Sequence, residues 1–214
     1  MRPLVIFGAG GLGRELLGWI NASSEAFRTK WRITAFVADD AAPGATCAGL
    51  PVNRRVDFVD PPRYLLAIGS PAARRRLFAE LEALGWEAVT WIHETVLVGQ
   101  GVEIGAGTIV CPFSTLSADT KVGRSVLING RCGIGHDTEI GNYAVLLGDA
   151  AVSGNVSIGE GALVGSAAVI HPGMRVGDGA IVGIGSVVVR NVEPGTSVFG
   201  NPARKISVDR GTSS

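Results

Sequence analysis

From residue 98 onwards, aliphatic side chains recur at every sixth position without a gap. Sixteen consecutive positions of this frame, from Val98 to Val188, hold valine, leucine or isoleucine. An amphipathic helix has a period near 3.6 and a half-buried strand a period of 2, so a strict period of six indicates short strands that turn a corner at regular intervals. The pattern predicts a parallel β-solenoid for the second half of the chain.

The positions around each aliphatic residue support this interpretation. Small residues such as Thr108, Cys132 and Ala150 stand two positions before it, where they suit a tight corner. Glycine often follows it directly, as at Gly99 and Gly135, and we expect this slot to have the positive φ that glycine adopts without penalty. Three faces of six residues give a coil of 18, so residues 18 apart should stack at about the 4.8 Å spacing of paired strands.

The first 90 residues have a different pattern, in which short apolar runs alternate with helical periodicity. We expect strands at 4–7, 33–37, 64–68 and 86–91, and helices after residue 13 and over 72–84. This βαβ order predicts a small Rossmann-like parallel sheet, whose ligands bind at the carboxyl ends of the strands. We therefore predict two domains, an α/β domain at 1–91 and a solenoid with a C-terminal tail at 92–214.

A glycine-rich loop follows the first predicted strand and opens the first helix. Gly8, Gly10 and Gly13 form the pattern G-x-G-x-x-G, which lets the backbone approach a phosphate at a helix N-terminus. A purely structural tight turn would give the same spacing. Only about 90 residues precede the repeat, which leaves room for one mononucleotide-binding half, so we expect a nucleoside diphosphate rather than a dinucleotide.

Polar residues close the next two predicted strands. Asp39 and Asp40 follow the second strand, where a carboxylate can reach a base or a ribose, although two solvated turn aspartates would look the same. Gly69 and Ser70 follow the third strand. The predicted substrate site consists of Gly8, Gly10, Gly11, Leu12, Gly13, Asp39, Asp40, Gly69 and Ser70.

One histidine of the solenoid is not explained by the core. His136 lies outside the aliphatic slot and is followed by Asp137, and a neighbouring carboxylate can orient an imidazole that acts as a general base. Gly154 lies 18 residues later, so its amide should lie one coil above the imidazole and could stabilise an oxyanion. We predict a catalytic set of His136, Asp137, Gly154 and Asn129. A surface turn histidine and a plain turn asparagine are the alternatives.

Composition bears on the binding partners and the cellular location of the protein. The net charge is 0 and the pI is near 6.8, which does not indicate a surface that binds nucleic acid. No apolar run approaches the roughly 18 residues of a transmembrane helix, and the N-terminus lacks the pattern of a signal peptide. We expect a cytoplasmic protein that does not insert into a membrane.

Cysteine and histidine spacing argues against a metal site. Three cysteines show neither metal-ligand spacing nor an even disulfide set, and Cys132 occupies a corner slot where we expect a buried small residue rather than a nucleophile. A zinc site shared between coils needs histidines separated by multiples of 18, which His93, His136 and His171 are not. We expect His93 and His171 to be structural or solvated, and we predict no metal.

Taken together, these motifs resemble the bacterial sugar-nucleotide acetyltransferase family with hexapeptide repeats. The resemblance covers nearly the whole chain, and its anchors are Phe7–Gly11, Phe36–Asp40, Ala67–Ser70, Asn129, Ile134–Asp137, Ser153–Val156 and Gly200–Arg204. It implies a left-handed parallel β-helix, a homotrimer, and acetyl-coenzyme A bound along the solenoid between neighbouring subunits. We assign the acetyl donor to Gly154, Gly165, Ser166, Gly183 and Arg204. Many relatives have histidine where this chain has Leu12 and Val145.

The resemblance also implies a reaction, with a place in glycan biosynthesis. An acetyl group would pass from acetyl-CoA to the amino group of a nucleotide-linked amino-deoxy sugar, for which we expect UDP. His136 would accept the proton of the amine, Asp137 would position His136, Gly154 would hold the oxyanion, and Asp39 would contact the base. Two alternatives stay open: O-acetylation of a sugar or sialic acid hydroxyl, or transfer of another acyl group, and a non-catalytic solenoid that binds a nucleotide or partners.

Overall fold

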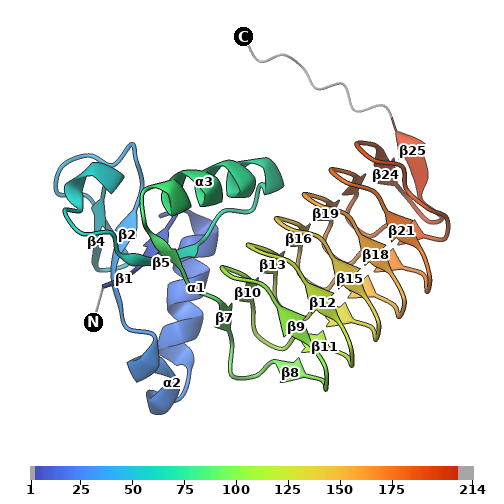
Figure 1. Cartoon of the computed structure of the whole chain (residues 1–214), viewed down its shortest axis with the longest axis horizontal. Coiled ribbons are helices and arrows are strands. Elements are labelled where there is room, and N and C mark those ends of the chain that lie inside the picture. Colours follow the sequence, from blue (N-terminus) through green and yellow to red (C-terminus); the bar gives the residue numbers. More distant parts are fainter. Residues whose placement is uncertain (1–2, 207–214) are drawn as a thin grey trace, which may run out of the picture.

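The computed structural model describes residues 3–206. Figure 1 shows an α/β domain beside the first coils of a long β-solenoid, with one helix of that domain reaching over a face of the solenoid. No helix within residues 3–206 combines the length and the apolar character that a membrane crossing requires.

The α/β domain is built on a six-stranded sheet. Its strands are β1 (Leu4–Phe7), β2 (Ile33–Val37), β3 (Thr46–Cys47), β4 (Leu50–Asn53), β5 (Arg63–Leu66) and β6 (Glu87–Ala88). Their order is β3-β4-β2-β1-β5-β6, and every pair is parallel except the β3–β4 hairpin. The helical segments are α1 (Gly11–Ala22), α2 (Glu25–Lys30), the 3₁₀ turn η1 (Arg55–Asp57) and α3 (Pro71–Ala83).

Alternation along β1 explains how the helices cover this sheet. Leu4 and Ile6 pack in one apolar cluster with residues of α1, whereas Val5 and Phe7 pack in another with residues of α3. Successive side chains of a strand point to opposite faces, so α1 and α3 cover opposite sides of the sheet. The predicted parallel core of β1, β2 and β5 is confirmed.

Other parts of this domain differ from the prediction. The β3–β4 hairpin and α2 were not expected from the sequence pattern. The hairpin turns at Ala48 (φ 48°) and Gly49 (φ 80°), and Ala-Gly lacks the Asn or Asp that marks such turns. The predicted strand at 86–91 is two strands, because β6 ends the α/β sheet and β7 (Trp91–Ile92) begins the solenoid. β7 thus spans the predicted domain boundary.

Three parallel sheets form the faces of the solenoid. Face 1 contains β7 (Trp91–Ile92), β10 (Ile109–Val110), β13 (Leu127–Ile128), β16 (Val145–Leu146), β19 (Leu163–Val164), β22 (Ile181–Val182), β24 (Ser197–Phe199) and the antiparallel β25 (Arg204–Ile206). Face 2 contains β8 (Leu97–Val98), β11 (Thr115–Leu116), β14 (Gly133–Ile134), β17 (Ala151–Val152), β20 (Val169–Ile170) and β23 (Val187–Val188). Face 3 contains β9 (Glu103–Ile104), β12 (Lys121–Val122), β15 (Glu139–Ile140), β18 (Ser157–Ile158) and β21 (Arg175–Val176).

The predicted coil of 18 residues is confirmed by the strand register. Ile109 pairs with Leu127 and Leu127 with Val145, and the other two faces repeat the same step. In β8 to β23 the frame aliphatic is the second residue of the strand and points into the prism, where it joins one continuous apolar core. Val98 of the first coil stays 48% exposed, because only one neighbouring coil covers it.

The glycines that follow the aliphatic residues do not have the conformation we expected. No positive φ occurs at Gly99 or Gly135, and the left-handed residue stands two positions later, as at Asp137 (φ 54°). Close packing explains these glycines instead: a Cβ on Gly99 would lie 2.8 Å from the amide nitrogen of Ala118 in the next coil. Successive coils therefore approach each other closely at these glycines.

The α/β domain packs on the outer side of face 1. Trp91, Ile109, Leu127 and Val145 point outward from that face and are buried in the apolar cluster that includes α1. Leu12 packs against this same cluster. Leu12 and Val145 thus contribute to one apolar contact between domain and solenoid.

Candidate active site

His136 lies at the corner between faces 2 and 3, in the turn that joins β14 to β15. Its carbonyl accepts the amide of Asn155 from the next coil at 2.8 Å, and the amide of Asp137 donates to Ala118 of the previous coil at 3.0 Å. Both neighbouring coils therefore hold the turn. Asp137 is left-handed (φ 54°), a conformation that aspartate tolerates better than most residues.

The side chains of His136 and Asp137 form a pair. Nδ1 of His136 lies 2.7 Å from Oδ2 of Asp137, and the two side chains are 61% and 55% exposed in a single chain. A carboxylate accepts a hydrogen bond only, so this contact assigns the proton to Nδ1 and leaves the Nε2 lone pair available. The arrangement can accept a proton at Nε2.

Gly154 stacks directly on this imidazole, as the coil register predicts. A Cβ built on Gly154 would lie 2.6 Å from Nε2 and 2.8 Å from Cε1 of His136. Within residues 3–206 the amide of Gly154 donates no hydrogen bond. A proton acceptor and a backbone donor thus adjoin each other on one corner.

The other predicted solenoid residues lie away from the corner that carries His136. Asn129 is at the corner between faces 1 and 2, where its Oδ1 accepts the amide of Gly130 at 2.7 Å. Gly165 and Ser166 follow it two coils later on that corner, and Gly183 lies under the ring of Phe199. Arg204 is exposed in β25. Face 2 separates these residues from His136, so one chain does not bring the predicted donor set together.

The predicted acceptor loops meet at one edge of the α/β sheet. β2, β1 and β5 are adjacent and parallel, so the loops after Phe7, Val37 and Leu66 leave from the same side. A Cβ on Gly8 (φ 111°) would lie 2.6 Å from the carbonyl oxygen of Ala67, and one on Gly13 would overlap the carbonyl of Gly8. Packing explains these two glycines.

Packing does not explain the other glycines at this edge. Gly10 caps the N-terminus of α1 and Gly11 begins it, and a Cβ on either would meet no atom within 4 Å. Gly69, beside the N-cap residue Ser70 of α3, is equally open. Open backbone at the start of a helix suits an anion, because the amides and the helix dipole both favour negative charge.

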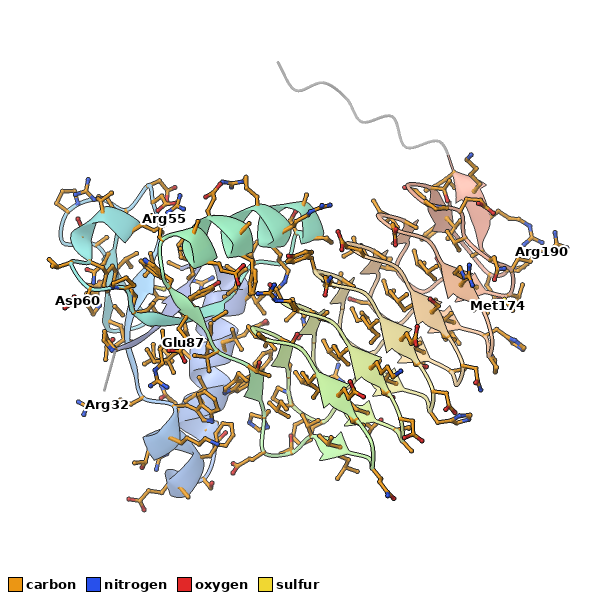
Figure 2. All side chains as sticks on the ribbon, viewed as in Figure 1. Arg32, Arg55, Asp60, Glu87, Met174 and Arg190 are labelled. Atoms are coloured by element: carbon orange, nitrogen blue, oxygen red, sulfur yellow. The ribbon has the colours of Figure 1, made fainter. Side chains whose placement is uncertain are left out.

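Asp39 is not a free carboxylate. Nε of Arg55 donates to Oδ1 of Asp39 at 2.8 Å, and a second guanidinium nitrogen lies 2.7 Å from Oδ2. Arg55 also contacts Glu80 at 2.8 Å and lies over the ring of Phe7, at 5.8 Å from its centroid. The two carboxylates raise the pKa of Arg55, with Asp39 the larger cause. Figure 2 shows Arg55 on the part of the α/β domain away from the solenoid. Asp40 is exposed.

Sequence reasoning missed Arg55. It follows β4, a strand that was not predicted, and one arginine among the 19 Lys and Arg residues of the chain has no distinguishing spacing.

A cleft of about 1010 Å³ opens between α3 and the solenoid. Gly69 and Ser70 line its upper wall, and Leu163 and Ile181 of face 1 line its floor. An ion pair of 3.2 Å between Arg75 and Glu160 joins its two sides. The cleft begins where the α/β domain stops covering the apolar outer side of face 1.

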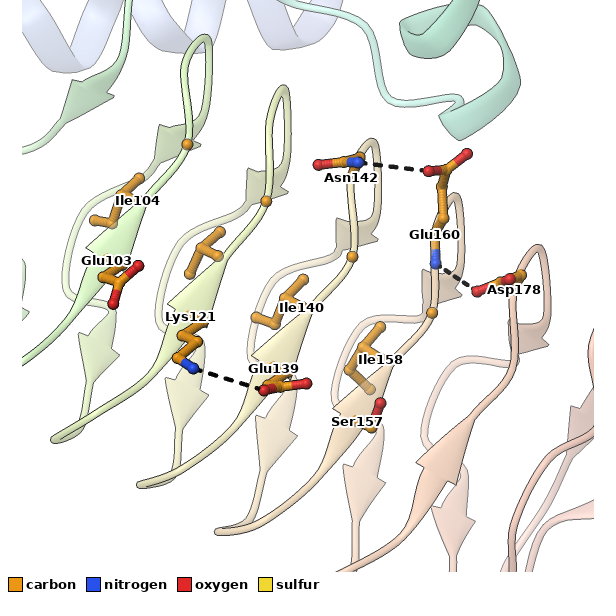
Figure 3. Close-up of a pocket in the computed structure, with 15 residues that line it drawn as sticks. Glu103, Ile104, Lys121, Glu139, Ile140, Asn142, Ser157, Ile158, Glu160 and Asp178 are labelled. Carbon is orange, nitrogen blue, oxygen red and sulfur yellow. Dashed lines mark hydrogen bonds and ion pairs between the residues drawn. The ribbon is translucent and has the colours of Figure 1, made fainter.

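A shallower groove of about 610 Å³ follows the outer side of face 3 (Figure 3). Polar residues stacked along one corner of this groove connect successive coils. Asp178 accepts the amide of Glu160 at 2.8 Å, and the Asn142 amide nitrogen lies 3.4 Å from the Glu160 carboxylate. Lys121 and Glu139 face each other at 4.0 Å. These groups stabilise the stack, and none of the predicted site residues lines the groove.

Cys132 and His93 are buried and His171 is solvent-exposed, in line with the sequence prediction. Cys132 is 1% exposed, and burial raises the pKa of its thiol to about 12. His93 is buried between Ser23 and Thr95. His171 is exposed at the corner that carries His136. Among residues 3–206, no group of three or more His, Cys, Asp or Glu side chains has the arrangement of a metal site.

Comparison with known proteins connects this architecture to a family. No protein-family model matches the chain. The chain is similar to a GDP-perosamine N-acetyltransferase of Escherichia coli O157:H7, with 34% identity over 123 residues that cover 56% of this chain and 55% of that protein. The match therefore spans about half the length of this curated relative.

Solved structures extend the similarity to nearly the whole chain. WeeI from Acinetobacter baumannii AYE is 31% identical with a TM-score of 0.88, over 96% of this chain and 100% of that one. PerB from Caulobacter crescentus in complex with CoA and GDP-perosamine is 28% identical with a TM-score of 0.85, over 96% and 97%. The predicted fold, a small parallel α/β domain followed by a left-handed parallel β-helix, is confirmed, and the chain belongs to the hexapeptide-repeat family of sugar-nucleotide acetyltransferases.

Proposed function

We propose that the protein transfers the acetyl group of acetyl-CoA to the amino group of a nucleotide-linked amino-deoxy sugar. The observation that carries this proposal is the His136–Asp137 contact of 2.7 Å with Gly154 stacked on the imidazole. A base with a fixed tautomer beside an amide that donates no bond is suited to acyl transfer. Two relatives are named as perosamine N-acetyltransferases or bound to GDP-perosamine and CoA, which supports the same chemistry.

The proposed reaction passes through one tetrahedral intermediate. The sugar amine attacks the thioester carbonyl carbon, a C–N bond forms, and Nε2 of His136 accepts the proton that the amine loses. The Gly154 amide donates to the oxyanion. The C–S bond then breaks, and the leaving thiolate takes the proton from the imidazolium to give CoA. Asp137 keeps the imidazole oriented with Nε2 toward the amine.

We further propose that the active site forms between copies of the chain. His136 and Gly154 lie on the corner between faces 2 and 3, whereas Gly165 and Ser166 lie on the corner between faces 1 and 2. A second copy can bring its own corner to the first, and the outer residues of face 2 suit close packing because several are small, as at Gly133 and Ala151. Such a contact joins two different patches, so it closes only as a ring. Three copies, as the family resemblance implies, make a homotrimer with three active sites.

The proposed acceptor binds at the carboxyl edge of the α/β sheet. Gly10, Gly11 and Gly69 offer open backbone near two helix N-termini for the diphosphate. Asp39, held by Arg55, is the proposed contact to the base. Our expectation of UDP is a prediction that competes with GDP, the nucleotide in the names of two relatives.

A thiol-release assay with acetyl-CoA tests the proposal. The acceptors are UDP- and GDP-linked 4-amino- and 3-amino-deoxy sugars, with sialic acids and simple alcohols as the alternatives. We expect turnover with an amino sugar, and a loss of about 10²- to 10⁴-fold in kcat for His136→Ala. Turnover only with hydroxyl acceptors would replace N-acetylation by O-acetylation, and wild-type kcat in His136→Ala would exclude the proposed base. A monomeric mass by light scattering at assay concentration would exclude the shared site.

A further inference from the structure

Arg74 of α3 is a charged side chain with no exposure to solvent. Among the described residues no carboxylate pairs with it, and burial lowers the pKa of its guanidinium to about 10. Burying an unpaired charge is costly unless its hydrogen bonds are satisfied. The position of Arg74 therefore calls for an explanation beyond packing.

Each of the five N–H donors of Arg74 has its own acceptor. Nε donates to the carbonyl of Ser125 at 2.8 Å, and the two protons of one terminal nitrogen reach the carbonyls of Leu66 (2.8 Å) and Ile68 (2.9 Å). The other terminal nitrogen lies 3.4 Å from both the Ser125 hydroxyl and the Val126 carbonyl. All five acceptors are neutral oxygens, and the guanidinium is the only side chain with enough donors in a fixed fork to satisfy them.

These acceptors belong to two separate parts of the fold. Ser125 and Val126 lie at the solenoid corner between faces 3 and 1. Leu66 ends β5, and Ile68 lies in the loop that leads to Gly69 and Ser70. Arg74 therefore fastens the proposed acceptor loop to the solenoid at a fixed position.

The fastening extends to the glycine loop by direct contact. Gly8 packs so closely on the carbonyl of Ala67 that a Cβ would lie 2.6 Å from that oxygen, and Gly13 packs on Gly8 in turn. A shift of the segment between Leu66 and Ile68 would displace both loops at the carboxyl edge of the sheet.

We propose that Arg74 is a positioning residue for the nucleotide part of the acceptor. It holds the loops after β1 and β5 in the geometry that binds the diphosphate. It also fixes the position of these loops relative to the solenoid that carries the acetyl donor. This inference rests on the proposed function, because it takes these loops as the acceptor site.

Binding of GDP and of UDP to the full chain, measured by calorimetry, tests the inference. We expect Arg74→Met to weaken the tighter of the two nucleotides by about tenfold or more, because small displacements of positioning groups have large effects. CoA affinity should change by less than about twofold. Arg74→Lys keeps the charge with three donors instead of five, so its nucleotide affinity should lie between those of the wild type and Arg74→Met. It replaces Arg74→Met as the test variant if Arg74→Met does not fold.

Leu81→Ala is the matched control for lost stability. Leu81 is fully buried on the same helix and packs in the apolar cluster between α3 and the sheet. It should lower Tm while leaving the nucleotide Kd unchanged. In turnover, both Arg74 variants should raise KM for the acceptor more than KM for acetyl-CoA.

The outcomes separate this inference from the proposed function. Wild-type affinity for nucleotide in both Arg74 variants, or equal weakening by Leu81→Ala, would leave Arg74 with a structural role only and overturn the inference alone. If the wild-type chain binds neither GDP nor UDP, the assignment of the loops to the acceptor fails, and the inference fails with it.

Discussion

The Cα of Gly154 lies against the imidazole of His136, its neighbour 18 residues earlier in the chain. A methyl group on that Cα would lie 2.6 Å from Nε2, closer than non-bonded carbon and nitrogen approach in proteins. The missing side chain at position 154 therefore gives the imidazole its position and keeps Nε2 accessible. Structure and proposed chemistry impose the same requirement on this residue.

Gly154→Ala should therefore reduce kcat by about 10²-fold, because displacing a base by a fraction of an ångström to an ångström costs about that much. The φ of Gly154 is not in the left-handed region, so an alanine backbone is allowed and only the contact with the ring changes. Steady-state kinetics with acetyl-CoA and the acceptor identified by the thiol-release assay measure the effect.

Gly148→Ala is the matched control. Gly148 occupies the same slot on the neighbouring corner, and a Cβ there would meet its nearest atom, the carbonyl oxygen of Gly130, at an ordinary 3.5 Å. Its kcat should stay within about twofold of the wild type. An equal loss of kcat in both variants would mean that any side chain in this slot disturbs the solenoid. It would contradict a specific role for the contact between Gly154 and His136.

Asp137→Asn should lower kcat while leaving the fold intact, because an amide can hold Nδ1 by its oxygen but does not stabilise the imidazolium. We expect a loss smaller than that of His136→Ala, which itself removes about 10²- to 10⁴-fold. Asp119 is the control, since it occupies the same slot one coil earlier with a similar φ of 57° and follows an alanine. Asp119→Asn should leave kcat unchanged, and equal effects of the two changes would refute the role of Asp137.

The sequence predicts the solenoid well because one rule repeats in every coil. The position of Gly154 over His136 follows from that rule alone. The rule failed for the backbone of the glycine slot, because the pattern of glycines is the same whether a positive φ or a neighbouring coil demands it. In the folded protein the Ala118 amide lies 2.8 Å from where a Cβ of Gly99 would stand.

The α/β domain shows where such prediction ends. Apolar runs in the sequence predict its parallel strands. The contact of Arg55 with Asp39 joins residues from different loops, and no local sequence pattern predicts it. Arg74 is the clearer case: it stands in a run of three arginines, Arg74 to Arg76, and only the fold buries the first of them. Long-range contacts of single polar side chains leave no periodic pattern in the sequence from which they could be predicted.

Close approach and conformational entropy predict opposite effects for two glycine substitutions. A Cβ on Gly141 would lie 2.6 Å from the amide nitrogen of Glu160 in the next coil, so Gly141→Ala should destabilise the protein by about 1–3 kcal/mol. Gly18 lies exposed in α1 with no atom within 4 Å of an added Cβ. Gly18→Ala should stabilise by about 0.5–1 kcal/mol. Urea unfolding followed by circular dichroism compares the two, and effects of the same sign would contradict the explanation of the glycine slot.

The buried imidazole of His93 should make the protein less stable under mildly acidic conditions. The Thr95 amide donates to Nδ1 at 3.2 Å, so Nδ1 is an acceptor and Nε2 donates to the Ser23 hydroxyl at 2.9 Å, which in turn donates to the Trp19 carbonyl. A proton on Nδ1 would oppose the Thr95 amide. Burial, the largest cause, lowers the pKa of His93 below its usual 6.5, while Glu94 acts in the opposite direction.

The sign of the pH dependence follows from which state takes the proton first. As the pH falls through about 6.5 the unfolded chain protonates this histidine while the folded chain does not, so the free energy of unfolding decreases until the lower folded pKa is reached. Urea midpoints at pH 7.5 and pH 5.5 should therefore differ more in the wild type than in His93→Gln, which is neutral at both. The variant should be less stable at pH 7.5, by about 1 kcal/mol for a disturbed buried hydrogen bond. An equal pH dependence in both proteins would show that other groups, and not this buried imidazole, control stability in the acidic range.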